Sequence, residues 1–203
     1  MKYLYLIGSL LVLGIKIQLY FLLRTFKGGI IFGIFPAVFG CFRIATKCIN
    51  DKDISHVYLK AELEKENKEE NVKINILGYI FAFAFAVVAV NMQISRELIQ
   101  INVLHWFLLA IALIIISMWI YVIALFTKYE LPIKQYILQS FLCSITGIVE
   151  TIAIFLAIGI ATALGLTVPP LSFFLGAGMV VLPHAWFARN AIARFERVFY
   201  KKA

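Results

Sequence analysis

Long runs of apolar residues recur along this chain and constrain its fold more than any other feature. A helix rises 1.5 Å per residue, so about 20 apolar residues cross the roughly 30 Å hydrocarbon core of a bilayer. Helices satisfy their own backbone hydrogen bonds in lipid, where water is absent. The predicted spans are residues 3–23, 30–45, 74–92, 103–126, 136–164 and 171–188. We therefore predict an all-α, polytopic transmembrane helical bundle of about six spans, forming a single membrane domain over residues 1–203.

Composition supports this class. Hydrophobic residues make up 63% of the 203-residue chain, and its mean hydropathy is +0.93. Soluble domains contain roughly 45–50% apolar residues. A soluble protein with this composition would lack the polar groups to cover its surface.

Two of the predicted spans leave alternatives open. Segment 30–45 contains Gly33, Pro36 and Gly40, so it either crosses the membrane or forms a re-entrant hairpin. Segment 136–164 is long enough to tilt or to begin at the membrane interface.

The basic residues predict a topology. With an inside N-terminus and six spans, fifteen basic residues lie inside, whereas Arg24, Lys27 and Arg96 lie outside and Lys16 lies within a span. This bias follows the positive-inside rule. It predicts a multi-pass protein of the cell membrane with both termini in the cytoplasm, provided that segment 30–45 crosses fully.

Residues 46–73 form the predicted cytoplasmic arm. Charged residues dominate its second half, and a helix is expected through that stretch. The arm is either a solvated helical element or a docking surface for a partner, with Tyr58, Leu59 and Leu63 as the candidate dock.

The last stretch, from His184 onward, has the pattern of an amphipathic helix. Apolar residues fall on one face and basic residues on the other, which suits a helix at the inner membrane surface. The candidate contacts with lipid headgroups are Arg189, Arg194, Arg197 and Lys201.

Charges inside spans are costly unless they are paired or hydrated. Lys16 lies in the first predicted span and Glu150 in the fifth, with Gln18 two residues after Lys16. These three residues are the candidate intramembrane polar site. We expect Lys16 and Glu150 to face the bundle interior. They either form an ion pair that fixes helix packing or line a polar cavity, unless Lys16 extends to the membrane surface.

Other chemistry finds no support in the sequence. Cys41, Cys48 and Cys143 have no disulfide or metal spacing, and Cys41 and Cys143 are expected to pack like alanine. His56, His105 and His184 are scattered, so no metal site is predicted. No nucleotide loop, cofactor motif or paired acid and base was found, and no nucleic-acid interface is expected. We predict a protein that is not an enzyme and uses no cofactor.

Three motifs resemble a known family. They are Gly33-Ile34-Phe35-Pro36-Ala37-Val38-Phe39 followed by Arg43 and Asn50-Asp51-Lys52-Asp53-Ile54, then Tyr129-Glu130-Leu131-Pro132-Ile133-Lys134-Gln135-Tyr136, and finally Ala193-Arg194-Phe195. Together they resemble the YesL-like family, which comprises small bacterial integral membrane proteins built around a domain of unknown function. The resemblance implies genes beside carbohydrate ABC importers and glycoside hydrolases, mostly in Gram-positive bacteria. It provides no catalytic residues.

Two functions follow as expectations. The first is an accessory or scaffold component linked to carbohydrate uptake, with an ABC transporter permease or a sensor kinase as partner. The second is a small solute transporter or channel, acting alone or as a homo-oligomer. In that case Lys16, Gln18, Glu150, Asn91 and Ser144 should converge on one hydrated cavity. The scarcity of polar residues within the spans favours the first.

Overall fold

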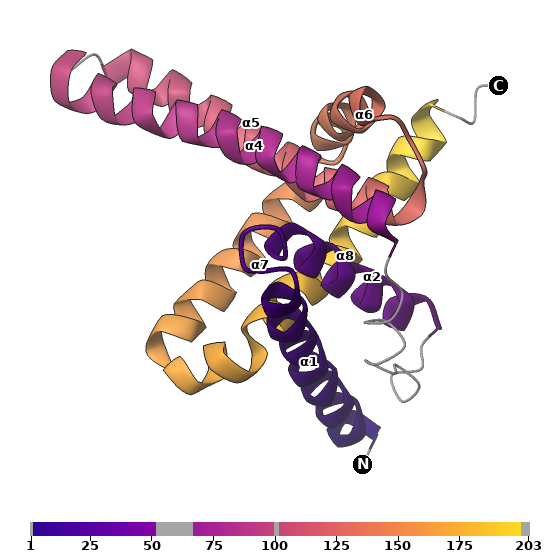
Figure 1. The fold of residues 1–203 in the computed structure, drawn as a ribbon. Coiled ribbons are helices and arrows are strands. Elements are labelled where there is room, and N and C mark those ends of the chain that lie inside the picture. Colours follow the sequence, from indigo (N-terminus) through magenta and orange to yellow (C-terminus); the bar gives the residue numbers. More distant parts are fainter. Residues whose placement is uncertain (1, 52–66, 100–101, 200–203) are drawn as a thin grey trace.

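The computed structural model describes residues 2–51, 67–99 and 102–199, and within them the chain is built from helices (Figure 1). The helices are α1 (Lys2–Lys27), α2 (Ile34–Asp51), α4 (Lys68–Ile94), the π-helix η1 (Ser95–Ile99), α5 (Asn102–Lys128), α6 (Ile133–Thr146), α7 (Ile148–Thr167) and α8 (Pro169–Phe199). Asn67 begins α4 by accepting a 3.0 Å hydrogen bond from the Glu69 amide. This is the usual capping role of a short polar side chain.

Five of these helical segments are long and apolar enough to cross a membrane. They are Gly8–Lys27, Lys68–Glu97, Asn102–Lys128, Ile148–Thr167 and Pro169–Val198. The prediction of an all-α bundle with several transmembrane helices is confirmed. The number of such helices among the described residues is five, not six.

Two predicted spans account for the difference. Segment 30–45 corresponds to a turn and to α2, which runs on to Asp51 and carries Arg43 and Lys47, so it is not among the five. Segment 136–164 is not one helix, because Gly147 separates α6 from α7. A Cβ atom on Gly147 would lie 2.8 Å from the Cβ of Ala191 and 2.9 Å from the Tyr121 hydroxyl, so only glycine fits there.

Helix α8 lies at the centre of the arrangement and packs against α1, α2, α5, α6 and α7. Its small residues Ala185, Ala188 and Ala191 are fully buried. Farther towards its N-terminus, Gly178 meets Gly14 of α1 so closely that an added Cβ would lie 2.6 Å from the Gly14 Cα. Small residues allow the close backbone approach that drives helix association in lipid.

The other helices form hairpins around α8. In Figure 1 the α4–α5 hairpin extends away from the rest of the molecule, and α7 and α8 form a second hairpin. Helix α2 runs back along α1, where Gly40 faces the Tyr20 ring and the Cys41 thiol donates to the Ile17 carbonyl over 3.6 Å. Phe35 of α2 packs edge-on against Trp119 of α5, with ring centres 5.5 Å apart.

Two further predictions need correction. The ends of the predicted arm belong to α2 and α4, while residues 52–66 lie outside the described residues. The predicted C-terminal amphipathic helix is present as the last part of α8, but its location on the inner membrane surface needs correction. Its apolar residues Ala188, Ala191, Ile192 and Phe195 are buried against the protein and not laid on the bilayer. The apolar residues do share one face of the helix, but their spacing in the sequence does not show whether that face packs against protein or against lipid.

All three cysteines are buried, as the packing prediction requires for Cys41 and Cys143. Burial raises the pKa of the Cys41 thiol far above its ordinary value. Burial, and to a lesser extent the Glu196 carboxylate, raises the pKa of Cys143 to about 12. Both thiols lie on helices outside the five candidate spans.

We therefore predict that the folded protein resists alkylation at both positions. The thiolate is the reactive form, and a raised pKa keeps these thiols protonated well above neutral pH. In a Cys48→Ser background, iodoacetamide labelling measured by mass spectrometry should be at least about a hundredfold slower in the folded protein than in SDS at every pH between 7 and 9, because far less thiolate is present. Native labelling at the rate seen in SDS would contradict the prediction.

Candidate functional site

Glu150 lies in the first turn of α7, where it is buried with 6% of its surface exposed. Its Oε1 accepts a 2.7 Å salt-bridge contact from Nη2 of Arg194 on α8. The positive end of the α7 dipole also favours a carboxylate at this place. The other carboxylate oxygen, Oε2, is buried and has no hydrogen-bond partner among the described residues. Arg194 therefore contacts only one of the two carboxylate oxygens of Glu150.

A hydrogen-bonded cluster lies on the same turn of the chain. Thr151 donates from its hydroxyl to the Gly147 carbonyl over 2.8 Å. The Tyr121 hydroxyl of α5 lies 3.1 Å from the same carbonyl and 2.8 Å from the Thr151 hydroxyl. We call Tyr121, Gly147, Glu150, Thr151 and Arg194 the polar junction. It joins α5, α7 and α8 at the break between α6 and α7.

A second group of polar contacts lies nearby on α5, α6 and α8. Lys128 and Tyr129 both donate to the Glu196 carboxylate. The Tyr136 hydroxyl of α6 donates to the Tyr129 carbonyl over 2.5 Å and accepts from the Leu131 amide over 3.0 Å. Burial is the main reason that the pKa of Tyr136 is raised. These contacts fix the turn between α5 and α6.

The predicted intramembrane site does not assemble. Glu150 faces the interior as expected, but it pairs with Arg194 and not with Lys16. Lys16 is half-buried on α1 and makes no hydrogen bond or ion pair with the residues that the structure describes. Gln18 accepts a 2.8 Å hydrogen bond from the Ala177 amide and so connects α1 to α8.

Asn91 and Ser144, the other residues of the predicted hydrated cavity, bond to their own helices and do not join Glu150. Asn91 donates to the Val87 carbonyl of its own helix and is exposed, and Ser144 donates to the Phe141 carbonyl. His184 is a packed core histidine, because Nε2 lies 3.0 Å from the Ile120 carbonyl and the ring meets Phe42 edge-on at 4.8 Å. Within the described ranges, no three His, Cys, Asp or Glu side chains gather as a metal site requires.

The predicted surface contacts divide into three cases. Arg189 and Arg197 are exposed, as headgroup contacts would be. Arg194 is half-exposed but belongs to the polar junction. Lys201 and the candidate dock of Tyr58, Leu59 and Leu63 lie outside the described residues.

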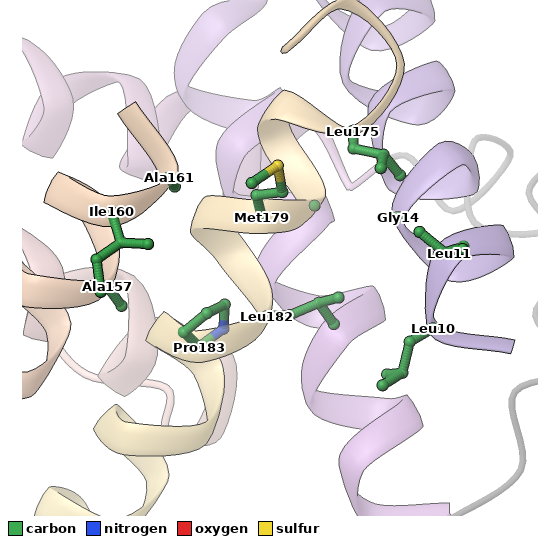
Figure 2. A pocket seen from close by; sticks show the side chains of 11 residues that line it. Leu10, Leu11, Gly14, Ala157, Ile160, Ala161, Leu175, Met179, Leu182 and Pro183 are labelled. Carbon is green, nitrogen blue, oxygen red and sulfur yellow. The ribbon is translucent and has the colours of Figure 1, made fainter. Parts of the chain in front are cut away.

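An apolar cavity of about 500 Å³ lies between α1, α7 and α8 (Figure 2). Leu10 and Leu11 approach from α1, while Met179 and Pro183 approach from α8. On α7 its lining residues are Ala157, Ile160 and Ala161. With only apolar side chains and glycines around it, this cavity fits hydrocarbon and offers no path to an ion.

Tyr121, Gly147 and Thr151 were not predicted as site residues from the sequence. Tyr121 sits inside the most apolar run, and the glycine falls within what reads as a continuous span. A usable signal was present in the sequence Thr146-Gly147 with Glu150 three residues later. A charge in the first turn after a helix break is better placed than a charge in mid-span.

Fold and composition define the chain as a multi-pass α-helical membrane protein. Residues 15–92 match the family model described as "Protein of unknown function, DUF624". The "Uncharacterized protein YesV" of Bacillus subtilis (strain 168) is 28% identical over 179 residues, which covers 86% of this chain and 84% of that protein. No solved structure matches the chain. The chain is therefore similar to proteins whose descriptions give no activity.

We predict that Glu150 and Arg194 are energetically coupled. Glu150→Gln should lower the free energy of unfolding by about 1–2 kcal/mol, because Arg194 loses a charged partner but stays half in contact with solvent. Adding Arg194→Gln should then cost little more, since the interaction is already lost. SDS titration of the purified protein in mild detergent measures both variants and the double variant.

The matched control is Lys16→Gln, which should be additive with Glu150→Gln to within about 0.5 kcal/mol. Additive effects of Glu150→Gln and Arg194→Gln would show that the observed contact contributes nothing. Coupling of Glu150 to Lys16 would instead restore the ion pair predicted from the sequence.

Proposed function

We propose that this protein is a non-enzymatic accessory or scaffold component of a bacterial membrane complex for carbohydrate uptake. Its partner would be an ABC transporter permease or a sensor kinase. The observation that carries the proposal is the separation of the polar groups. Glu150, Gln18, Asn91 and Ser144 each bond to different neighbours, so the described residues offer no continuous polar path.

The carbohydrate link has a different basis. It rests on the resemblance to the YesL-like family, whose genes lie beside carbohydrate importers. The similarity of residues 15–92 to a family of unknown function agrees with that resemblance without adding a substrate. The proposal therefore names a substrate class and not a sugar.

A small solute transporter is the second candidate. One observation favours it: Glu150 keeps a buried oxygen with no partner among the described residues. Such an oxygen can bind a proton or a cation, and carboxylates inside membranes commonly serve ion pathways. The apolar cavity beside α1 argues against a hydrated route at that place.

Transport and accessory roles are separated by one reconstitution. Proteoliposomes holding the purified chain alone should take up no labelled oligosaccharide above empty vesicles. Co-expression with a carbohydrate ABC importer permease from the same bacterium should yield a stoichiometric complex. Replacing Tyr58, Leu59 and Leu63 by alanine should release that partner, whereas Lys60→Ala with Lys65→Ala should not. Uptake by the chain alone, lost in Glu150→Gln, would replace the accessory role with the transporter.

We also propose an orientation within the cell membrane that differs from the six-span topology. That topology puts Arg24 outside and Asn71 inside, yet Arg24 donates to Asn71 over 3.1 Å. Asn75 donates to the Phe32 carbonyl over 3.1 Å, which also brings the α1–α2 turn to the start of α4. These contacts support a shared side for both segments.

With five crossings, the positive-inside rule favours an outside N-terminus and a cytoplasmic C-terminus. Apart from Lys2, Lys16 and Arg96, every Lys and Arg of the sequence then lies towards the cytoplasmic end of a candidate span or in a segment assigned to the cytoplasm. Helices α2 and α6 would lie at the inner side without crossing. An odd number of crossings necessarily puts the termini on opposite sides.

Protease added to intact spheroplasts should therefore remove an N-terminal epitope tag and spare a C-terminal one. After lysis both tags should be lost. The six-span topology predicts protection of both tags until lysis, so the N-terminal tag decides between the two arrangements. Immunoblotting of a cytoplasmic protein in the same samples confirms that the spheroplasts are intact.

A further inference from the structure

A second cavity, of about 350 Å³, lies where α2, α5 and α8 meet. One part of its wall is apolar and comes from Phe42, Ala124, Ala185 and Ile192. The other part is formed by Thr46, Thr127, Lys128 and Arg189. The lining thus holds two cations, two hydroxyl groups and no acidic side chain.

The two cations are available to different degrees. Lys128 is half-exposed and shares its ammonium with Glu196. Arg189 is exposed and makes no ion pair or hydrogen bond within the part of the chain that the structure describes. Of the two lining cations, Arg189 is therefore the one with unused donors, and a guanidinium offers them in a planar fork that suits phosphate.

The hydroxyl groups add adaptable polar contacts. Thr46 donates to the Phe42 carbonyl over 2.9 Å and Thr127 donates to the Ile123 carbonyl over 2.9 Å. Those carbonyls belong to helices whose backbone already bonds internally, so each hydroxyl can rotate to a ligand at little cost. Cavities of about 300–1,000 Å³ with a few convergent polar groups are the usual size for small ligands.

We propose that this cavity binds the phosphate of a phosphate ester that has a net negative charge and an apolar part. Arg189 and Lys128 contact the phosphate, and the Phe42 and Ile192 side chains cover the apolar part. An anionic phospholipid presents both parts at the membrane surface, whereas a soluble glycerol phosphate presents the phosphate alone. Basic pockets between transmembrane helices commonly hold anionic headgroups. The site does not depend on the accessory role proposed above.

Native mass spectrometry of the full-length protein in detergent tests the proposal. Phosphatidylglycerol should bind more tightly than phosphatidylcholine. Arg189→Gln should weaken phosphatidylglycerol binding roughly fivefold, and Lys128→Gln with Arg189→Gln should weaken it further, since each cation near a membrane surface contributes about 1 kcal/mol. Arg197→Gln is the matched control, because this residue is exposed on the same helix and does not line the cavity.

Competition with glycerol 3-phosphate identifies the source. If it displaces the lipid, the site accepts the soluble ester; if it does not, the site requires the membrane lipid, and both outcomes support a phosphate site. Equal binding of the two lipids, or wild-type affinity in the Arg189→Gln variant, would overturn the proposal. Arg189→Gln breaks no hydrogen bond or ion pair with the described residues, and an unchanged melting temperature of the variant shows that its effect reports binding and not misfolding.

Discussion

The close packing of α8 against five other helices is the contact on which the rest of the structure depends. Lipid tails are as apolar as leucine, so burial of apolar surface does not by itself drive one helix onto another in a membrane. Close contact between backbones does, and it requires small residues. Gly178 against Gly14, and Ala191 against Gly147, meet this requirement at two levels of α8. Once α8 is fixed, α1 and the α6–α7 break are fixed with it.

The polar contacts follow from this packing. Because α8 ends among the ends of α5, α6 and α7, its Arg194 and Glu196 meet groups that lie 44 and 68 positions away in the sequence, Glu150 and Lys128. The Arg194–Glu150 pair neutralises a carboxylate that would otherwise be buried without a counter-charge, whereas both partners of the Lys128–Glu196 pair are partly exposed. Such pairs add little to stability when one partner is half-exposed, but they select which helix ends lie together. The polar junction therefore fixes how the ends of α5, α7 and α8 align, and it does not have the features of a reaction centre.

The apolar runs made the fold class predictable, since hydrophobic length alone identifies a membrane helix. The same criterion failed at two places, for physical reasons. A single glycine in an apolar run is tolerated in a helix, so nothing local marked the end of α6 at Gly147. Helix α2 has Pro36 and two cations, and its contacts with α1, α4, α5 and α8 determine where it lies. Arg194 was expected at lipid headgroups because amphipathic periodicity does not specify what the polar face meets.

The distribution of exposed groups limits how a partner could recognise this protein. Large apolar side chains such as Phe83, Trp106 and Phe107 are exposed along the α4–α5 hairpin. In lipid such exposure costs nothing, because the acyl chains replace the protein as an apolar neighbour. Exposed apolar area on the hairpin is therefore no sign of a binding site. Specific recognition requires groups that lipid tails cannot match, and Lys128, Arg189 and the polar junction form one such set in the described residues. A protein partner that contacts this set meets the same groups as a lipid headgroup, so occupancy of the basic cavity would alter the surface that such a partner contacts.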